Sequence, residues 1–90
     1  MPTTNDRNEG YIITGLFETM PGHGIAVARR EKIIVNDPSP WVTWEYGTQT
    51  VLDADIRYDE TSYYWGHYFA DKYEATKDFC SRIYAELDIR

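Results

Sequence analysis

The chain has 90 residues, of which 42% are hydrophobic and 16% aromatic, and its formal net charge is −6. A chain of this length supports one hydrophobic core, and it has no apolar run long enough to cross a membrane. Cys80 is the single cysteine, so no internal disulfide can form, which favours a reducing compartment such as the cytoplasm. The acidic balance argues against direct nucleic-acid binding, because nucleic-acid binders carry a basic footprint.

The first expected element is a strand that follows the N-terminal segment. Residues 1–10 contain neither the basic nor the apolar part of a signal peptide, and we expect a flexible tail there, followed by a single domain over residues 11–90. Residues 11–18 (YIITGLFE) are rich in strand-forming side chains. Gly15, in the middle of this strand, predicts a bulge or the close approach of another group to the backbone.

A turn and a returning strand are expected next. Pro21 and Gly22 are typical turn residues, and the run 24–35 that follows them is rich in strand formers. This pattern predicts the second arm of a hairpin, with a kink near Arg30. The two prolines of residues 36–40 end the strand, because proline cannot donate to the ladder of hydrogen bonds.

The middle of the chain predicts one clear strand and one ambiguous segment. Residues 41–46 (WVTWEY) alternate, so that Trp44 lies on the face better suited to the core and Trp41 lies on the other face. Residues 47–61 are compatible with a half-buried strand and also with a long acidic hairpin loop. Both interpretations stay open for this segment.

Residues 62–69 (SYYWGHYF) form the most aromatic segment of the chain, and we expect a strand there. Strict alternation predicts that four side chains face the core: Tyr63, Trp65, His67 and Phe69. Tyr64 and Tyr68 are then expected on the opposite face. A histidine surrounded by rings in this way is interpreted as a packed core residue rather than as a catalytic base.

A helix is expected from about Lys72 to Leu87. Asp71 stands at the N-cap position with Glu74 three residues later, which is a variant of the capping box. One stripe at helical spacing is predicted to face the sheet, and Asp78 is predicted to face away from it; the stripe consists of Tyr73, Thr76, Cys80, Ile83, Tyr84 and Leu87. A thiol on such a stripe is expected to be buried and unreactive. Together these elements predict an α+β domain, an antiparallel meander of four to five strands with one C-terminal helix packed on one face.

No pattern for metal binding, a cofactor or catalysis stands out. The histidines and the cysteine lack the paired spacing of zinc ligands, and the run 53–60 (DADIRYDE) fails the calcium-loop pattern because Arg57 occupies a ligand position. An enzyme that uses His67 and Cys80 is the least favoured hypothesis. We therefore expect no catalytic residue, no metal, no cofactor and no enzymatic activity.

Acidic and aromatic residues together predict a surface that binds protein. The expected charged contacts are Asp53, Asp55, Asp59 and Glu60, and the expected aromatic anchors are Trp41, Tyr64 and Tyr68. Carboxylates form charge-assisted hydrogen bonds with arginine, as phosphates do. A basic protein surface is therefore the expected partner, without direct contact to nucleic acid or membrane.

The segments WVTWEY and SYYWGHYF, followed by a helix that contains Ala75, Phe79 and Arg82, resemble the short accessory proteins encoded by phages and other mobile elements. The resemblance covers about half of the chain and carries no diagnostic motif, so no residue inherits a role from it. Proteins of this class include inhibitors of bacterial defence nucleases, notably anti-CRISPR proteins. The resemblance implies a phage-encoded inhibitor in the host cytoplasm that blocks a nucleic-acid-binding surface, for example on Cas9, as a DNA mimic.

A second hypothesis is a small structural or regulatory protein that acts as a homodimer. An exposed strand or an aromatic face would join the two copies. The sequence leaves open whether the protein is a monomer or a homodimer.

Overall fold

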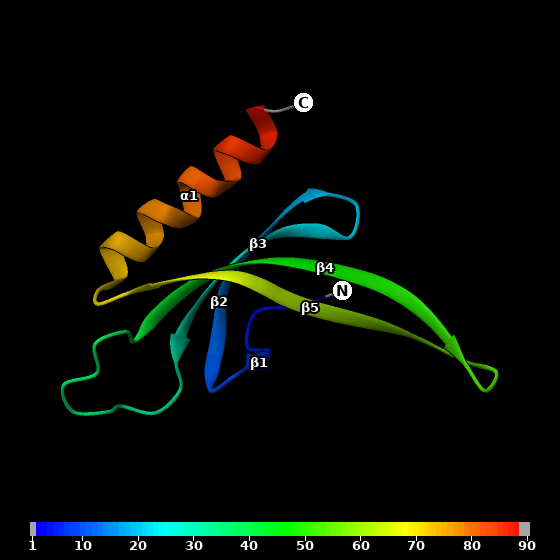
Figure 1. Cartoon of the computed structure of the whole chain (residues 1–90), viewed down its shortest axis with the longest axis horizontal. Coiled ribbons are helices and arrows are strands. Elements are labelled where there is room, and N and C mark those ends of the chain that lie inside the picture. Colours follow the sequence, from blue (N-terminus) through cyan, green and yellow to red (C-terminus); the bar gives the residue numbers. More distant parts are fainter. Residues whose placement is uncertain (1, 89–90) are drawn as a thin grey trace.

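The computed structural model describes residues 2–88 and has an antiparallel sheet of five strands with one C-terminal helix lying across it (Figure 1). The elements are β1 (Arg7–Asn8), β2 (Tyr11–Met20), β3 (His23–Arg30), β4 (Trp41–Asp53), β5 (Ile56–Phe69) and α1 (Lys72–Asp88). Each strand pairs with the strand that precedes it in the chain, so the sheet is a meander. The predicted α+β architecture is therefore confirmed.

The segment predicted as an N-terminal tail contributes a short strand. Arg7 and Asn8 form β1 and pair with the start of β2. The backbone amide of Asn5 donates to the carbonyl of Ile13, 2.8 Å away, and Pro2 is buried. Most residues of this segment are polar and exposed, which explains why the sequence pattern gave no sign of the pairing.

The predicted returning strand is wrong in its second half. β3 ends at Arg30, and residues 31–40 form a loop in which Ile33 is 99% exposed. The guanidinium of Arg30, the last residue of β3, donates to the carboxylate of Asp37 and to the carbonyl of Ser39. These bonds hold the two ends of the loop together directly after β3. The aliphatic residues of the loop therefore have no neighbouring strand to pair with, although their β propensity is high.

The main core lies on the face of the sheet that points away from α1. Tyr11, Trp44 and Tyr46 are buried there and form one aromatic cluster with Tyr63. The ring centroids of Tyr11 and Trp44 are 5.6 Å apart, and those of Trp44 and Tyr63 are 5.4 Å apart. Ala26 lies directly opposite Trp44 and leaves room for the indole. Because each ring buries roughly 150–250 Å², a few rings can form this core without a covering helix.

The opposite face of the sheet carries α1. Gly15 sits at a register shift in β2, as the sequence predicted, and a Cβ atom at this position would lie 2.8 Å from Val27 Cγ1 and 3.7 Å from Phe79. The absence of a side chain therefore lets Phe79 approach the sheet closely. Ala75 is the fully buried residue of the helix and lies on the same side as Phe79. Asp71 caps the helix as predicted, because its carboxylate accepts from the amide of Glu74 at 2.8 Å.

Charged side chains hold the middle of α1 against the sheet. Arg82 Nη2 donates to the carbonyl of Trp65 at 2.9 Å and to the Glu45 carboxylate at 3.3 Å. Arg82 Nη1 donates to the Thr43 hydroxyl at 3.2 Å, and this hydroxyl donates to Asp78 Oδ2 at 2.6 Å. The Thr43 side chain is fully buried beneath the helix.

The predicted inward stripe of α1 is therefore wrong in orientation. Asp78, predicted to face solvent, contacts the sheet, whereas Tyr73, Tyr84 and Cys80, predicted to be buried, are exposed. Hydrophobic spacing alone places these rings inward. The salt bridge between Arg82 and the sheet, together with the close approach of Phe79 above Gly15, turns a different side of the helix toward the strands.

A bulge in β5 overturns the predicted alternation of residues 62–69. The register shifts between Thr43 and Glu45, so that two residues of β5, Trp65 and Gly66, lie opposite Trp44. Trp65 adopts a positive φ of 53°, which is unusual for a side chain of this size. The bulge reverses which side chains face the core from that point to the end of the strand.

Several side chains of the aromatic segment, residues 62–69, therefore face the other way from the prediction. Tyr63 faces the core as predicted, but Trp65 is 69% exposed and His67 is exposed on the helix side. Tyr68, predicted on the outer face, lies on the core side with its ring centroid 6.3 Å from that of Tyr11. The interpretation of His67 as a packed core histidine is therefore wrong.

Candidate functional site

β4 and β5 extend beyond the rest of the sheet as a two-stranded ribbon. The pairing of β3 with β4 ends where His23 lies opposite Gly47, whereas the pairing of β4 with β5 continues to Asp53 and Ile56. Residues 48–61, here called the ribbon, therefore form strand pairs with each other, and at the base of the ribbon the Thr48 amide also donates to the Gly22 carbonyl at 2.7 Å. Figure 1 shows the ribbon projecting along the longest axis of the molecule, away from α1. Residues 47–61, which the sequence left open between strand and loop, belong to strands except at the turn.

The turn of the ribbon is tight and consists of two residues. Ala54 and Asp55 connect the strands with φ values of 49° and 67°. Positive φ at both central positions is the geometry of a type I′ turn, which matches the twist of a hairpin. The backbone thereby fixes Asp53 and Asp55 at the far end of the ribbon, where both are exposed.

The predicted acidic residues all lie on the ribbon and all are exposed: Asp53, Asp55, Asp59 and Glu60. The four carboxylates and the guanidinium of Arg57 give the ribbon a net charge of −3. The Thr50 hydroxyl donates to Asp59 Oδ1 at 3.0 Å across the two strands. Strand pairing places Asp59 on one face of the ribbon and Glu60 on the other, so both faces carry negative charge.

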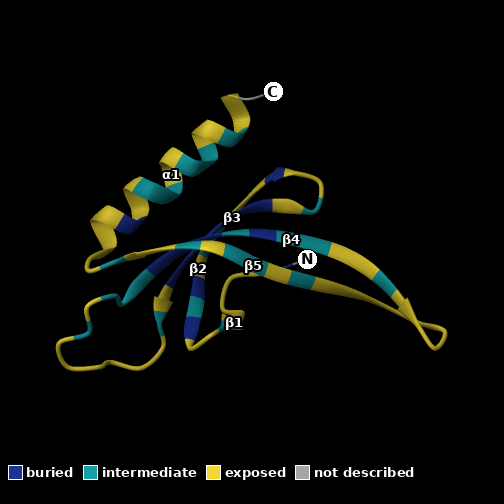
Figure 2. Cartoon of the chain, in the orientation of Figure 1, coloured by how far each residue is buried: buried dark blue, intermediate teal, exposed yellow. Residues whose placement is uncertain are grey.

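Apolar side chains on the ribbon are also exposed to solvent. Leu52 is 70% exposed, Ile56 is 64% exposed and Tyr58 is 43% exposed. The outer part of β4 and β5 is accordingly coloured as exposed for most of its length in Figure 2. A two-stranded hairpin outside a sheet is only marginally stable in water, and burying such side chains against another surface is favourable. The ribbon therefore combines carboxylates with apolar contact area.

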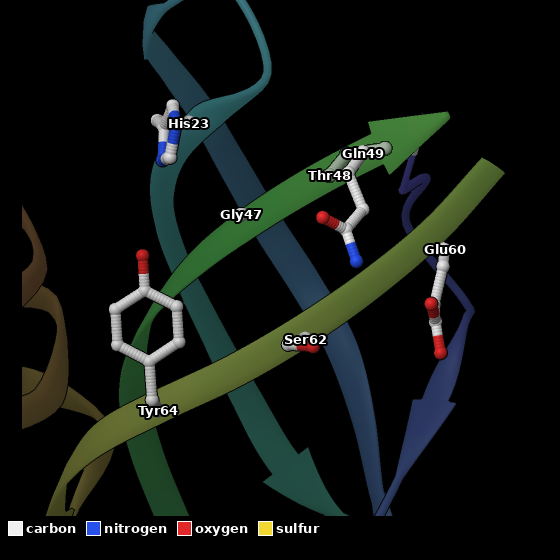
Figure 3. A pocket seen from close by; sticks show the side chains of 7 residues that line it. All are labelled: His23, Gly47, Thr48, Gln49, Glu60, Ser62 and Tyr64. Carbon is white, nitrogen blue, oxygen red and sulfur yellow. The ribbon is translucent and has the colours of Figure 1, made fainter. Parts of the chain in front are cut away.

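A shallow hollow lies at the base of the ribbon, on the same side of the sheet as α1 (Figure 3). Its volume is about 290 Å³, and it is lined by His23, Gly47, Thr48, Gln49, Glu60, Ser62 and Tyr64. A Cβ atom on Gly47 would lie in van der Waals contact with the Tyr64 hydroxyl and the His23 ring, 3.4 Å from each, so these two side chains flank the glycine in the hollow.

The chemistry of this hollow favours a cationic side chain. Glu60 supplies a carboxylate, and the side-chain oxygens of Gln49 and Tyr64 are further acceptors. Partial burial, with smaller contributions from the Glu45 and Glu86 carboxylates, raises the pKa of Tyr64. The phenol hydroxyl can both donate and accept a hydrogen bond.

The predicted aromatic anchors do not lie together. Of the three, Tyr64 borders the hollow at the base of the ribbon. Trp41 lies near the start of α1, with Lys72 Nζ 5.9 Å from its ring centroid. Tyr68 lies on the opposite face of the sheet, beside Tyr11. Trp65, which the sequence assigned to the core, is exposed and packs edge-on against Tyr64 with 5.1 Å between ring centroids.

A second arrangement of side chains that could support chemistry involves His67. Its Nδ1 lies 3.0 Å from Asp78 Oδ2, and its side chain is 53% exposed. The same Asp78 oxygen accepts from the Thr43 hydroxyl, so the carboxylate connects α1 to both β4 and β5. Cys80, the other residue of the enzyme hypothesis, lies on the outer face of α1 rather than beside the imidazole. The contacts of this pair are those of a tether between helix and sheet.

The remaining features of residues 2–88 add no further class of site. No group of three or more histidine, cysteine, aspartate or glutamate side chains is placed to hold a metal ion within this range. No helix in it is long and apolar enough to cross a membrane. No protein-family model matches the chain, and no curated protein or solved structure shows significant similarity to it.

Proposed function

We propose that the protein is a non-enzymatic binding module whose ribbon, residues 48–61, docks on a basic surface of another protein. The observation that carries this proposal is the ribbon itself. It leaves the sheet, has a net charge of −3 and exposes Leu52 and Ile56 near its turn. The core of the sheet contains neither Leu52 nor Ile56, so both side chains are available for contact with a partner.

The mode of binding follows from the chemistry of the ribbon. Carboxylates on both faces form charge-assisted and bidentate hydrogen bonds with arginine, and the geometry of these bonds fixes the orientation of the ribbon on its partner. The exposed apolar residues near the turn supply contact area that excludes water. At the base of the ribbon, an arginine or lysine of the partner enters the hollow and pairs with Glu60, while the Tyr64 hydroxyl accepts a hydrogen bond. Electrostatic attraction of this kind also increases the rate of association.

The narrower form of the proposal names the basic surface. A channel that binds DNA or guide RNA in a defence nuclease such as Cas9 is positively charged, and the carboxylates of the ribbon pair with arginine or lysine there in the way that phosphates do. The resemblance to phage accessory proteins favours this partner. The protein then acts as an anti-CRISPR-like inhibitor and a DNA mimic in the cytoplasm of the host cell.

Charge reversal on the ribbon tests the proposal. The variant Asp53→Lys with Glu60→Lys is compared with a control, Glu9→Lys with Glu74→Lys, which changes the net charge equally but lies away from the ribbon. Binding to an arginine-rich peptide, measured by calorimetry at two salt concentrations, should weaken at least tenfold in the ribbon variant and lose most of its salt dependence. The control should change binding by less than about threefold, because only long-range attraction is altered.

The nuclease form is tested in parallel by the cleavage of a DNA target by Cas9 in the presence of each variant. Inhibition by the native chain and the control, but not by the ribbon variant, is expected. Equal binding by the ribbon variant and the control contradicts the proposed binding site. Binding of the peptide without inhibition of the nuclease rejects the narrower form alone.

A further inference from the structure

The outer edge of β5 is open along the ribbon. β5 lies at the end of the sheet and pairs with β4 alone. The register between the two strands runs without a shift from Ile56 to Tyr64, and the bulge at Trp65 then interrupts it. Within residues 2–88, no backbone hydrogen bond reaches β5 from outside this pairing. The amide and the carbonyl of every second residue in this stretch therefore point away from β4, where another strand can pair with them.

The other open edges of the sheet are shorter or less regular. The outer edge of β4 within the ribbon is open only over residues 49–53, because the Thr48 amide is bonded to the Gly22 carbonyl. The edge of β2 beyond its pairing with β1 is interrupted by two register shifts. Residues 56–64 therefore form the longest regular open edge in the described part of the chain. They contain neither proline nor lysine, the residues that commonly keep other strands from joining an edge.

Charge favours a basic segment as the strand that joins this edge. The net charge of −3 on the ribbon counts every charged side chain of residues 48–61, and Asp59 and Glu60 belong to β5 itself. A second copy of the ribbon carries the same charge, so repulsion opposes pairing between two copies. An incoming strand with arginine or lysine side chains is attracted instead. The open stretch of β4 carries only Asp53, so the attraction is stronger on the side of β5.

The side chains beside this edge suit cations at alternate positions of the incoming strand. Glu60, Ser62 and Tyr64 follow one another on one face of β5 and line the hollow at the base of the ribbon (Figure 3). In Figure 3 the Glu60 carboxylate lies on the side of β5 that faces away from β4. Ser62 is small and exposed, so a long side chain can pass over it toward the hollow. Paired strands lie about 4.7–4.9 Å apart, which an arginine side chain can span.

We propose that the basic partner of the ribbon binds as an additional strand along the outer edge of β5, between Ile56 and Tyr64. This inference rests on the proposed function, because it gives the form of the partner that the ribbon binds. The partner is an extended segment with arginine or lysine at every second position. Backbone hydrogen bonds give the affinity, and cations that meet Glu60 and the hollow give the specificity. A third strand also stabilises a ribbon that is marginal with two strands.

Backbone methylation of a peptide separates strand pairing from charge attraction. The probe is a peptide of alternating arginine and threonine. When it is extended, all arginine amides point to one edge and all threonine amides point to the other. An N-methyl group on each amide of one set blocks one edge and leaves every charge in place. Binding of the unmodified peptide, of the two peptides methylated on one set and of the peptide methylated on both sets is measured by calorimetry.

Strand pairing predicts a specific order of affinities. Methylation of both sets should weaken binding at least tenfold. Methylation of one set should change binding by less than about threefold for at least one of the two sets, because a strand with one free edge can still pair. Strand pairing is overturned, and docking by charge alone remains, if the peptide methylated on both sets binds within about threefold of the unmodified peptide. A tenfold loss with each set alone also overturns strand pairing. No binding of the unmodified peptide contradicts the proposed function itself, and this inference with it.

Amide hydrogen exchange locates the added strand on the chain. With the unmodified peptide in excess, exchange should slow at every second residue between Ile56 and Tyr64, because those amides acquire a backbone acceptor. The amides of residues 49–53 in β4 should keep their rates. Slower exchange confined to residues 49–53, or the absence of any change in β5 while the peptide is bound, contradicts the assignment to the edge of β5.

Discussion

Replacing Arg82 with methionine should destabilise the protein strongly, although helical spacing alone gives Arg82 no place in the core. The guanidinium donates to two carbonyls, those of Thr43 and Trp65, and to the Glu45 carboxylate. Its side chain is 12% exposed and that of Glu45 is 24% exposed. Methionine retains the length of the side chain but leaves these acceptors without a donor beneath α1.

The size of the effect follows from the hydrogen bonds and the ion pair that the substitution removes. A hydrogen bond that involves a charged group contributes about 1.5–3 kcal/mol, and removing one partner of a buried ion pair costs about 3–5 kcal/mol. Partial exposure of Arg82 and Glu45 reduces the second figure, so we expect a loss of about 2–4 kcal/mol in the free energy of unfolding. A domain of this size has a total stability of about 5–13 kcal/mol, so the loss is a large fraction of it.

Urea unfolding followed by tryptophan fluorescence measures this loss, because Trp44 is buried in the core and reports global unfolding. Arg82→Lys serves as the matched control, since it keeps the charge but loses the planar fork, and it should fall between the native chain and the methionine variant. A methionine variant within about 0.5 kcal/mol of the native chain would refute the polar attachment of α1. Apolar contacts of Phe79 would then be sufficient to hold the helix.

Three further predictions concern the turn of the ribbon, the loop that follows β3, and the ion pair between Arg30 and Asp37. Ala54→Asn with Asp55→Gly should raise the free energy of unfolding by about 0.5–1 kcal/mol, because these residues favour the positive φ of the turn; a loss of stability in urea would contradict the turn type. Ile33→Lys should change that free energy by less than about 0.5 kcal/mol while raising solubility, and a larger loss would mean that the loop packs in solution. The hydrogen bond from Arg30 lowers the pKa of Asp37, so its contribution to stability is present at neutral pH and is lost as the pH falls through the lowered pKa. The difference in stability between the native chain and Asp37→Asn should therefore shrink between pH 7 and pH 3, and a constant difference would exclude this linkage.

The sequence predicted the fold class and most strands because local patterns carry that information. Alternation in residues 41–46, the turn at Pro21 and the cap at Asp71 are each decided within a few residues of the chain. Gly15 was also informative, because a glycine in a strand indicates a bulge or a close neighbour, and here both are present. These features depend little on the rest of the structure.

The errors arose where a distant contact or a single backbone angle decides the outcome. The positive φ of Trp65 reverses the faces of the residues that follow it. The local sign of this bulge is Gly66, its second residue, and strict alternation of side chains does not take that glycine into account. The orientation of α1 depends on Arg82 and its partners in β4, which are nearly forty residues away in the chain. Residues 53–60 are rich in acidic side chains, and they are exposed on the ribbon as that composition suggests. The three predicted aromatic anchors lie apart because of the register of β4 with β5 and the position of the start of α1.

The measurement that tests the central claim most directly is a nuclear magnetic resonance titration of the ¹⁵N-labelled chain with an arginine-rich peptide. We expect the amide shifts to change mainly over residues 48–61 and around the hollow beside Tyr64, and to revert as salt is added. Changes of equal size over the whole surface, or changes confined to α1, would contradict binding through the ribbon.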